Sequence, residues 1–137
     1  MRYLLDTGVW LRGVNDVETI PDNALKILQA SQEVFGLSSI SLWEIGKKVQ
    51  IGKLSLPKNL PAWYEDALTA DINLIPLTPA IVSDAMRLPD FPNRDPADEL
   101  IVATARIHKL TLFTTDTKLK NYRHARIHYF TPILPKP

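Results

Sequence analysis

Four carboxylates occupy places where a folded chain can gather side chains from distant segments. Asp6 follows a short apolar run, and Asp116 follows another late in the chain. Glu44 and Asp98 each lie in the first turn of a segment with the apolar spacing of a helix. Four carboxylates in one pocket would repel each other, and a divalent cation would remove that conflict. Hard oxygen ligands without thiolates or a histidine cluster suit Mg²⁺ or Mn²⁺, ions that can activate water and polarise a phosphodiester.

Asp98 is the most informative of these acids. On a helix it lines up with Val102 at i+4 and with Ala105 at i+7. Its carboxylate therefore continues an apolar stripe and points inward, where an unpaired charge is costly. Each of the other three acids, taken alone, has an ordinary structural explanation as a turn residue, a cap or a surface ion-pair partner. Only their joint placement favours a metal site.

The elements that would position these acids alternate between strands and helices. Such an alternation implies a parallel sheet covered on both faces, with the active site beyond the carboxyl ends of its strands. We therefore expect one α/β domain over residues 1–131, a three-layer α/β/α sandwich with four to five short strands, and a proline-rich tail over 132–137. The expected strands are 3–5, 34–37, 74–77, 110–114 and 127–130, and the expected helices are 9–14, 21–28, 41–49, 60–70, 78–86 and 95–109.

Length and composition narrow the possible functions. A chain of 137 residues favours a single domain. The absence of cysteine excludes disulfides, thiolate metal sites and a cysteine nucleophile, and it fits a cytoplasmic location. A formal net charge of +1 gives no global field for a polyanion, so nucleic-acid contact would need local basic groups. No apolar run approaches the roughly 18 residues of a membrane span, so we expect no membrane partner.

Four segments around the acids form a specific pattern: YLLDT at 3–7, SISLWEI at 39–45, RDPADELIVATA at 94–105 and LFTTD at 112–116. Together they resemble the PIN-domain family, and in particular the VapC-type toxins of prokaryotic toxin–antitoxin pairs. The resemblance runs in the family's order from residue 2 to about residue 130. It implies a PIN-like fold and a Mg²⁺- or Mn²⁺-dependent endoribonuclease that hydrolyses RNA phosphodiesters by a metal-activated water.

The resemblance also implies roles for particular residues. The metal ligands would be Asp6 and Asp98, with Asp116 and Glu44 completing the site directly or through water. Thr7 and Thr114 would hold the carboxylates or the attacking water. The third motif holds a second aspartate, Asp95, and either aspartate could be counted as the family's third acid. We choose Asp98, because the motif alignment and its inward direction agree, and we assign Asp95 as an N-cap ahead of Pro96. A departure from the family is Glu99, which adds negative charge where these toxins often have Arg or Gln.

The family further implies a homodimer and a cognate antitoxin that blocks the pocket. Trp10, Leu11 and Trp63 are candidates for those contacts if they are exposed, with ordinary core packing as an equal alternative. RNA phosphates would be met by cations near the rim of the sheet. The candidates are Arg12, Lys47, Lys48 and Arg94.

Two other functions remain open from the sequence. A PIN-like domain could act only as a binding module for an antitoxin or RNA, although a pure binder has no use for a repulsive acidic cluster. Asp6-Thr7-Gly8 is also the active-site tripeptide of aspartic proteases. That class would need a mostly β fold, whereas the second half of this chain favours helices.

Overall fold

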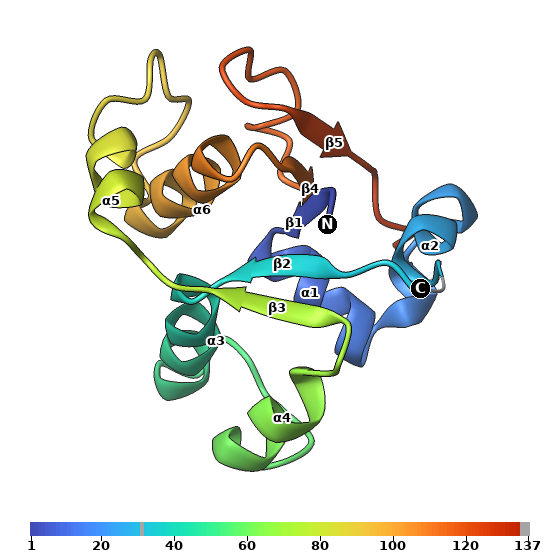
Figure 1. Cartoon of the computed structure of the whole chain (residues 1–137). Helices are drawn as coiled ribbons and strands as arrows, with labels where there is room; N and C mark the ends of the chain where they lie inside the picture. The colour runs from blue at the N-terminus through green and yellow to red at the C-terminus, as the bar shows by residue number, and fades with distance from the viewer. Residues whose placement is uncertain (31, 135–137) are drawn as a thin grey trace.

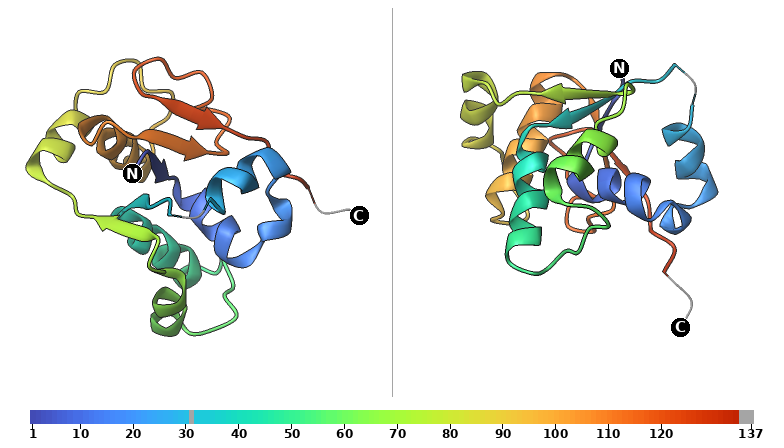
Figure 2. Two further views of the ribbon diagram at one scale, coloured as in Figure 1. Left: turned by 45° about the vertical axis from the view of Figure 1, so that its right-hand side comes forward. Right: turned by 90° about the horizontal axis from the view of Figure 1, so that it is seen from below.

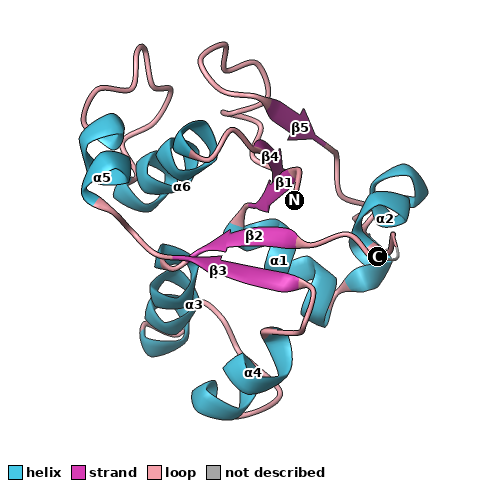
Figure 3. Cartoon of the chain, viewed as in Figure 1, coloured by secondary structure: helices cyan, strands magenta, loops and turns pink. Residues whose placement is uncertain are grey.

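A five-stranded parallel sheet forms the centre of the molecule, in the order β3-β2-β1-β4-β5. The computed structural model describes residues 1–30 and 32–134. Figures 1 and 3 show the sheet crossing the middle of the fold with helices around it. The prediction of an α/β fold with four to five parallel strands is confirmed. The strands are β1 (Tyr3–Leu5), β2 (Phe35–Ser38), β3 (Ile72–Ile75), β4 (Thr111–Thr114) and β5 (Ile127–Tyr129).

Helices cover both faces of the sheet, because its strands bury side chains on both sides. Leu4 and Leu112 pack on one face with residues of α5 and α6, whereas Leu5 and Phe113 pack on the other with residues of α1 to α4. Figure 2 shows α5 and α6 at one side of the molecule and α1 and α2 at the other. The helices are α1 (Thr7–Asn15), α2 (Asp22–Leu28), α3 (Ile40–Gln50), α4 (Leu60–Ala67), α5 (Pro79–Ala85) and α6 (Pro96–Ile107), with a 3₁₀ helix η1 (Val17–Thr19) after α1.

Capping residues fix where the helices of the second half begin. The Thr78 hydroxyl accepts a hydrogen bond from the Ile81 N–H, and the Asp95 carboxylate accepts one from the Ala97 N–H. A proline follows each cap, at a position where a helix needs no N–H donor. Both caps were expected from the sequence, and both are present. The start of α6 is thereby fixed, which sets the direction in which its first acidic side chains point.

Some expected boundaries were wrong by one to three residues. The helix α3 begins at Ile40 instead of residue 41, so Glu44 lies just past its first turn. The third strand is Ile72–Ile75 and ends before Pro76, which lacks the N–H that a continued strand would use. The helix α4 ends at Ala67, earlier than the expected residue 70. None of these shifts moves an acid out of its element's expected end of the sheet.

Trp10 and Trp63 belong to the core, so the suggestion that they form an exposed contact surface was wrong. Each is 2% exposed, and their rings meet edge to face with centroids 5.1 Å apart. The indole N–H of Trp10 donates to the Ala67 carbonyl at 3.2 Å, and that of Trp63 donates to the Asn15 side chain at 3.0 Å. With both donors satisfied, burial of these large rings is favourable. Leu11 is half-buried.

The chain end leaves β5 and returns to the 3₁₀ helix. The Ile133 N–H donates to the Thr19 carbonyl at 2.7 Å. Residues 135–137 of the expected proline-rich tail lie outside the described residues, so the boundary at residue 131 stays a prediction. In the part of the chain that the structure describes, no helix combines the length and the apolar character that crossing a membrane requires.

Candidate metal centre

The four acids singled out in the sequence interact with one another in the structure. Asp98 shows this most directly, because burial, followed by the charges of Asp6, Asp95, Glu44 and Asp116, raises its pKa to about 7. The topology explains the convergence. Asp6 and Asp116 follow the adjacent parallel strands β1 and β4, and the carboxyl ends of parallel strands meet at one rim.

Asp6 is held at the junction of β1 and α1. Its Oδ1 accepts a hydrogen bond from the Thr7 N–H at 2.8 Å, which makes Asp6 the N-cap of α1. Its Oδ2 accepts one from the Thr114 hydroxyl at 2.6 Å. Burial raises the pKa of Asp6 and the charge of Asp116 adds to this, while the two hydrogen bonds and Lys48 act in the opposite direction. Asp6 is thus oriented by two donors but carries an unfavourable charge.

Glu44 is oriented by a short chain of hydroxyls. The Thr7 hydroxyl donates to Glu44 Oε1 at 2.6 Å and lies 2.7 Å from the Ser41 hydroxyl. Because the single proton of Thr7 goes to Glu44, Ser41 must be the donor in the second bond. Burial raises the pKa of Glu44, opposed by the Thr7 hydrogen bond and reinforced by the charge of Asp6. Ser41 is fully buried and was not identified from the sequence.

Asp95 joins the acidic group as well as capping α6. Oxygen atoms of Asp95, Asp98 and Glu44 lie within 4.8 Å of one another. The side-chain amide of Asn93 makes two hydrogen bonds. Its Nδ2 donates to Asp98 Oδ2 at 3.1 Å, and its Oδ1 accepts the backbone N–H of Asp95 at 2.9 Å. The assignment of Asp95 as an N-cap is confirmed, but its place beside the other acids was missed. The spacing of three residues between Asp95 and Asp98 was the available signal, since it puts both side chains on one side of a helix start.

Asp116 is tied to the same network through its backbone. Its N–H donates to the Thr114 hydroxyl at 3.0 Å, and its Oδ1 accepts the Lys118 N–H at 2.9 Å. The two threonines proposed as auxiliary residues therefore contact the acids directly. Thr7 and Thr114 are 3% and 0% exposed, so their hydroxyls hold the carboxylates from the protein side of the site.

The donor set fits a hard divalent cation. Every group in it is a carboxylate. Within the described residues, Glu44, Asp95 and Asp98 approach closely enough to share one ion, and this group of three includes neither Asp6 nor Asp116. The raised pKa values of Asp6, Glu44 and Asp98 show that these groups are unfavourable as free anions. A bound cation reverses that preference. Oxygen-only ligands favour Mg²⁺ or Mn²⁺ over Zn²⁺ or Cu²⁺.

The four cations considered for RNA contact are distributed unevenly around this centre. Lys48 lowers the pKa of both Asp6 and Glu44, so its charge lies close to the acids. The Lys47 ammonium donates to Gln50 at 2.7 Å along the exposed side of α3. Arg94 is exposed immediately before Asp95, and Arg12 is half-buried on α1. Their roles stay predictions.

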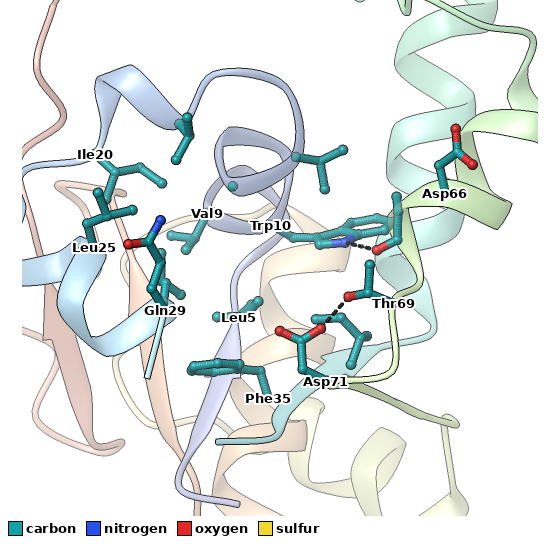
Figure 4. Close-up of a pocket in the computed structure, with 16 residues that line it drawn as sticks. Leu5, Val9, Trp10, Ile20, Leu25, Gln29, Phe35, Asp66, Thr69 and Asp71 are labelled. Carbon is teal, nitrogen blue, oxygen red and sulfur yellow. Dashed lines mark hydrogen bonds between the residues drawn. The ribbon is translucent and has the colours of Figure 1, made fainter. Parts of the chain in front are cut away.

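A separate apolar pocket lies away from the acids. It has a volume of about 340 Å³ between α1, α2 and the start of β2 and β3, and Leu5, Trp10 and Phe35 are among its lining residues. Figure 4 shows Asp66 and Asp71 beside it, with Asp71 accepting a hydrogen bond from Thr69. None of the four candidate acids lines this pocket, so it is not the metal centre.

Asp6-Thr7-Gly8 lies at a strand-to-helix junction of a parallel sheet. The mostly β fold that an aspartic protease requires is absent from the described residues. The aspartate in this tripeptide instead belongs to the acidic cluster.

Comparison with known proteins agrees with the fold. The family model for the PIN domain matches residues 3–125. A curated relative, Ribonuclease VapC22 of Mycobacterium tuberculosis, is 31% identical over 123 residues, which cover 90% of this chain and 93% of the relative. The chain belongs to the PIN-domain family, among its VapC-type members.

Solved structures share the architecture at low identity. VapBC2 from Rickettsia felis, bound to a DNA fragment from its promoter, superposes with a TM-score of 0.70 at 20% identity, covering 94% of this chain and 98% of that one. The Mycobacterium tuberculosis VapC20, a toxin that cleaves the sarcin–ricin loop, gives a TM-score of 0.61 at 14% identity, covering 90% and 98%. These likenesses confirm the fold.

Proposed function

We propose that this protein is a metal-dependent endoribonuclease and the toxin of a toxin–antitoxin module. The observation that carries the proposal is the convergence of Asp6, Glu44, Asp98 and Asp116 from four separate segments. Hydrogen bonds of Thr7 and Thr114 link the first two acids and Asp116, and a carboxylate oxygen of Glu44 lies within 4.8 Å of one of Asp98. A pure binding module gains nothing from such a cluster, because mutual repulsion destabilises the fold. The relationship to a VapC ribonuclease supports the same activity.

Different side chains of this protein would have different roles in such a site. Asp6 and Asp98 would hold the cation, with Asp116 and Glu44 completing the ligand set directly or through water. When bound, Mg²⁺ or Mn²⁺ supplies positive charge that polarises a phosphodiester and lowers the pKa of water. Thr114 and Thr7 hold Asp6 and Glu44 in place through hydrogen bonds of 2.6 Å. The phosphodiester would be cleaved to leave a 5′-phosphate and a 3′-hydroxyl end.

The partners we propose are an RNA substrate, a second copy of the chain and a cognate antitoxin. The antitoxin is supported by similar folds in solved toxin–antitoxin complexes, among them that from Rickettsia felis. A cytoplasmic location follows from this proposal, because RNA and the antitoxin would be met there.

A nuclease assay tests the proposal. RNA is incubated with the protein in Mg²⁺, in Mn²⁺ and in EDTA, and wild type is compared with Asp6→Asn and Asp98→Asn. We expect cleavage only with metal and a loss of about 100-fold or more in both variants, since each removes a charge that the cation needs. Asp71→Asn changes an exposed acid outside the cluster and should cleave like wild type. Cleavage that persists in EDTA would overturn the metal mechanism, and RNA binding without any cleavage would favour the binding module.

A further inference from the structure

A second concave surface lies near the far end of α6 from the acidic centre. It has a volume of about 460 Å³, and its lining includes Arg106, Lys109, Arg123, His124 and Arg126, with no acidic residue. We call this surface the basic pocket. It is formed by the end of α6, the short connection from α6 to β4 and the loop that leads into β5, which run beside one another in Figure 1. None of the four cations considered for RNA contact belongs to it.

Positive charge is concentrated in this part of a nearly neutral chain. Residues 106–126 contain six lysines and arginines and one acid, Asp116, whereas the remaining residues contain ten lysines and arginines against fourteen acids. The chain therefore has a basic segment within an otherwise acidic protein. Such local segregation produces a field that attracts polyanions even when the net charge is small.

Two arginines build the walls of the basic pocket. Arg106 donates to both carboxylate oxygens of buried Asp84, at 2.8 and 3.1 Å, and to the His124 carbonyl at 2.7 Å. Arg126 donates to the Lys109 carbonyl at 3.3 Å. These bonds hold the loop before β5 against the end of α6. The charge of Arg106 is balanced by Asp84, so Arg106 serves the fold and leaves binding to its neighbours.

Lys109 and Arg123 carry charges that the fold does not use. Both are exposed, and neither forms an ion pair within residues 1–30 and 32–134. The Lys109 ammonium and the Arg123 guanidinium are therefore available to an anionic ligand.

We propose that the basic pocket binds the phosphodiester backbone of the RNA substrate at a point remote from the cleavage centre. The inference rests on the proposed function, which supplies RNA as the polyanion. Asp98 and Arg106 are eight residues apart on α6, so the acids and the pocket are separated by about 12 Å along the helix axis. An RNA that reaches both must be extended or folded across that distance. Guanidinium and ammonium groups without acidic neighbours suit phosphate oxygens.

Binding measured without metal tests this inference separately from catalysis. A fluorescently labelled RNA hairpin is titrated in EDTA at several KCl concentrations, with fluorescence anisotropy as the readout. Lys109→Glu combined with Arg123→Glu should weaken binding about tenfold or more. The slope of log K against log salt should become shallower by about 0.9 for each lost phosphate contact. The control, Lys26→Glu with Lys53→Glu, makes the same change in net charge at exposed sites outside the basic pocket and should have a much smaller effect, since salt screens remote charges beyond about 10 Å.

The outcomes separate this inference from the proposed function. Equal weakening by both double variants, or by neither, would overturn the basic pocket as an RNA site. Unchanged RNA binding with loss of binding to an acidic antitoxin peptide would also overturn it, in favour of a protein occupant. If wild type cleaves no RNA with any metal while the hairpin result holds, the nuclease proposal fails and the pocket stands. Circular dichroism of both double variants confirms that each remains folded.

A second readout uses the length of the substrate. In Mg²⁺ or Mn²⁺, the Lys109→Glu, Arg123→Glu variant should cleave a short oligonucleotide confined to the acidic centre at the wild-type rate, while its cleavage of a longer folded RNA falls by about tenfold. A parallel loss on both substrates would indicate damage to the acidic centre and would contradict a remote contact.

Discussion

The Thr114 hydroxyl donates a hydrogen bond to Asp6 Oδ2 at 2.6 Å, although 108 positions of sequence separate the two residues. Pairing of β1 with β4 makes this contact possible. Leu5 lies opposite Phe113, so Asp6 and Thr114, which follow them in the chain, also come to lie beside each other. The same hydroxyl accepts the Asp116 N–H at 3.0 Å. One side chain therefore links two of the acids and fixes their relative positions.

Thr114→Val is expected to weaken the site more than the fold. The substitution keeps the size of the side chain but leaves Asp6 Oδ2 and the Asp116 N–H without this partner. We expect a loss of about 1–2 kcal/mol in the free energy of unfolding and a fall of about 10–100-fold in metal-dependent cleavage. Urea unfolding and the dependence of cleavage on Mn²⁺ concentration measure the two effects. Thr111→Val, at the other end of the same strand, is the control, and an equal loss of cleavage there would contradict the assigned role.

Asp98→Asn is expected to stabilise the protein when metal is removed. Asparagine keeps the acceptor for the Asn93 amide and removes a charge that repels Asp6, Asp95, Glu44 and Asp116. At pH 8 in EDTA, thermal unfolding should occur at the same temperature or a few degrees higher, since about 1 kcal/mol shifts Tm by roughly 2–8 °C. Glu65→Gln on the exposed side of α4 should leave Tm unchanged. A drop of many degrees for Asp98→Asn would instead indicate that its charge supports the fold.

Stability without metal should fall as pH rises from about 4 to about 7. Burial and neighbouring acids raise the pKa of Asp98 from 3.8 to about 7, so the folded state holds a proton that the unfolded state has lost. The contribution of this group is complete below pH 4 and is lost as pH rises through 7. Tm measured in EDTA across this range, for wild type against Asp98→Asn, isolates the effect. A difference between the two proteins that does not change with pH would contradict it.

Addition of metal should reverse this pH dependence. Mn²⁺ binds the ionised carboxylates and must displace their protons, so the increase in Tm that it causes should grow between pH 5 and pH 8. Comparing Tm with and without Mn²⁺ at both pH values measures the change. Asp6→Asn and Asp98→Asn should reduce the increase, whereas Asp71→Asn should retain it. An increase of the same size at both pH values would argue against binding at these acids.

Gly36→Ala should destabilise the fold through crowding with side chains of the neighbouring strands β1 and β3. A Cβ at this position in β2 would lie 2.9 Å from the Ile75 side chain and 3.1 Å from that of Leu4. Overpacking of this kind costs about 1–3 kcal/mol. Gly13→Ala is the matched control, since a Cβ there meets nothing within 4 Å and removes a glycine from α1, with an expected gain of about 0.5–1 kcal/mol. Urea unfolding of both variants should give opposite signs.

The sequence by itself determined the elements and the direction of the main acid. Apolar runs marked all five strands, and threonine–proline and aspartate–proline pairs marked the starts of α5 and α6. The inward direction of Asp98 followed from its spacing to Val102 and Ala105, both buried in the structure. These features depend on residues close together in one helix or strand, so the spacing of apolar residues in the sequence predicts them.

The tertiary structure alone decided which side chains meet. The strand order sets β1 between β2 and β4, and it thereby brings Thr7 to Glu44 and Thr114 to Asp6. It also buries Trp10 against Trp63 and folds the loop before β5 onto the end of α6. Contacts across tens of residues depend on how the layers pack, and no spacing within a single helix or strand encodes that arrangement.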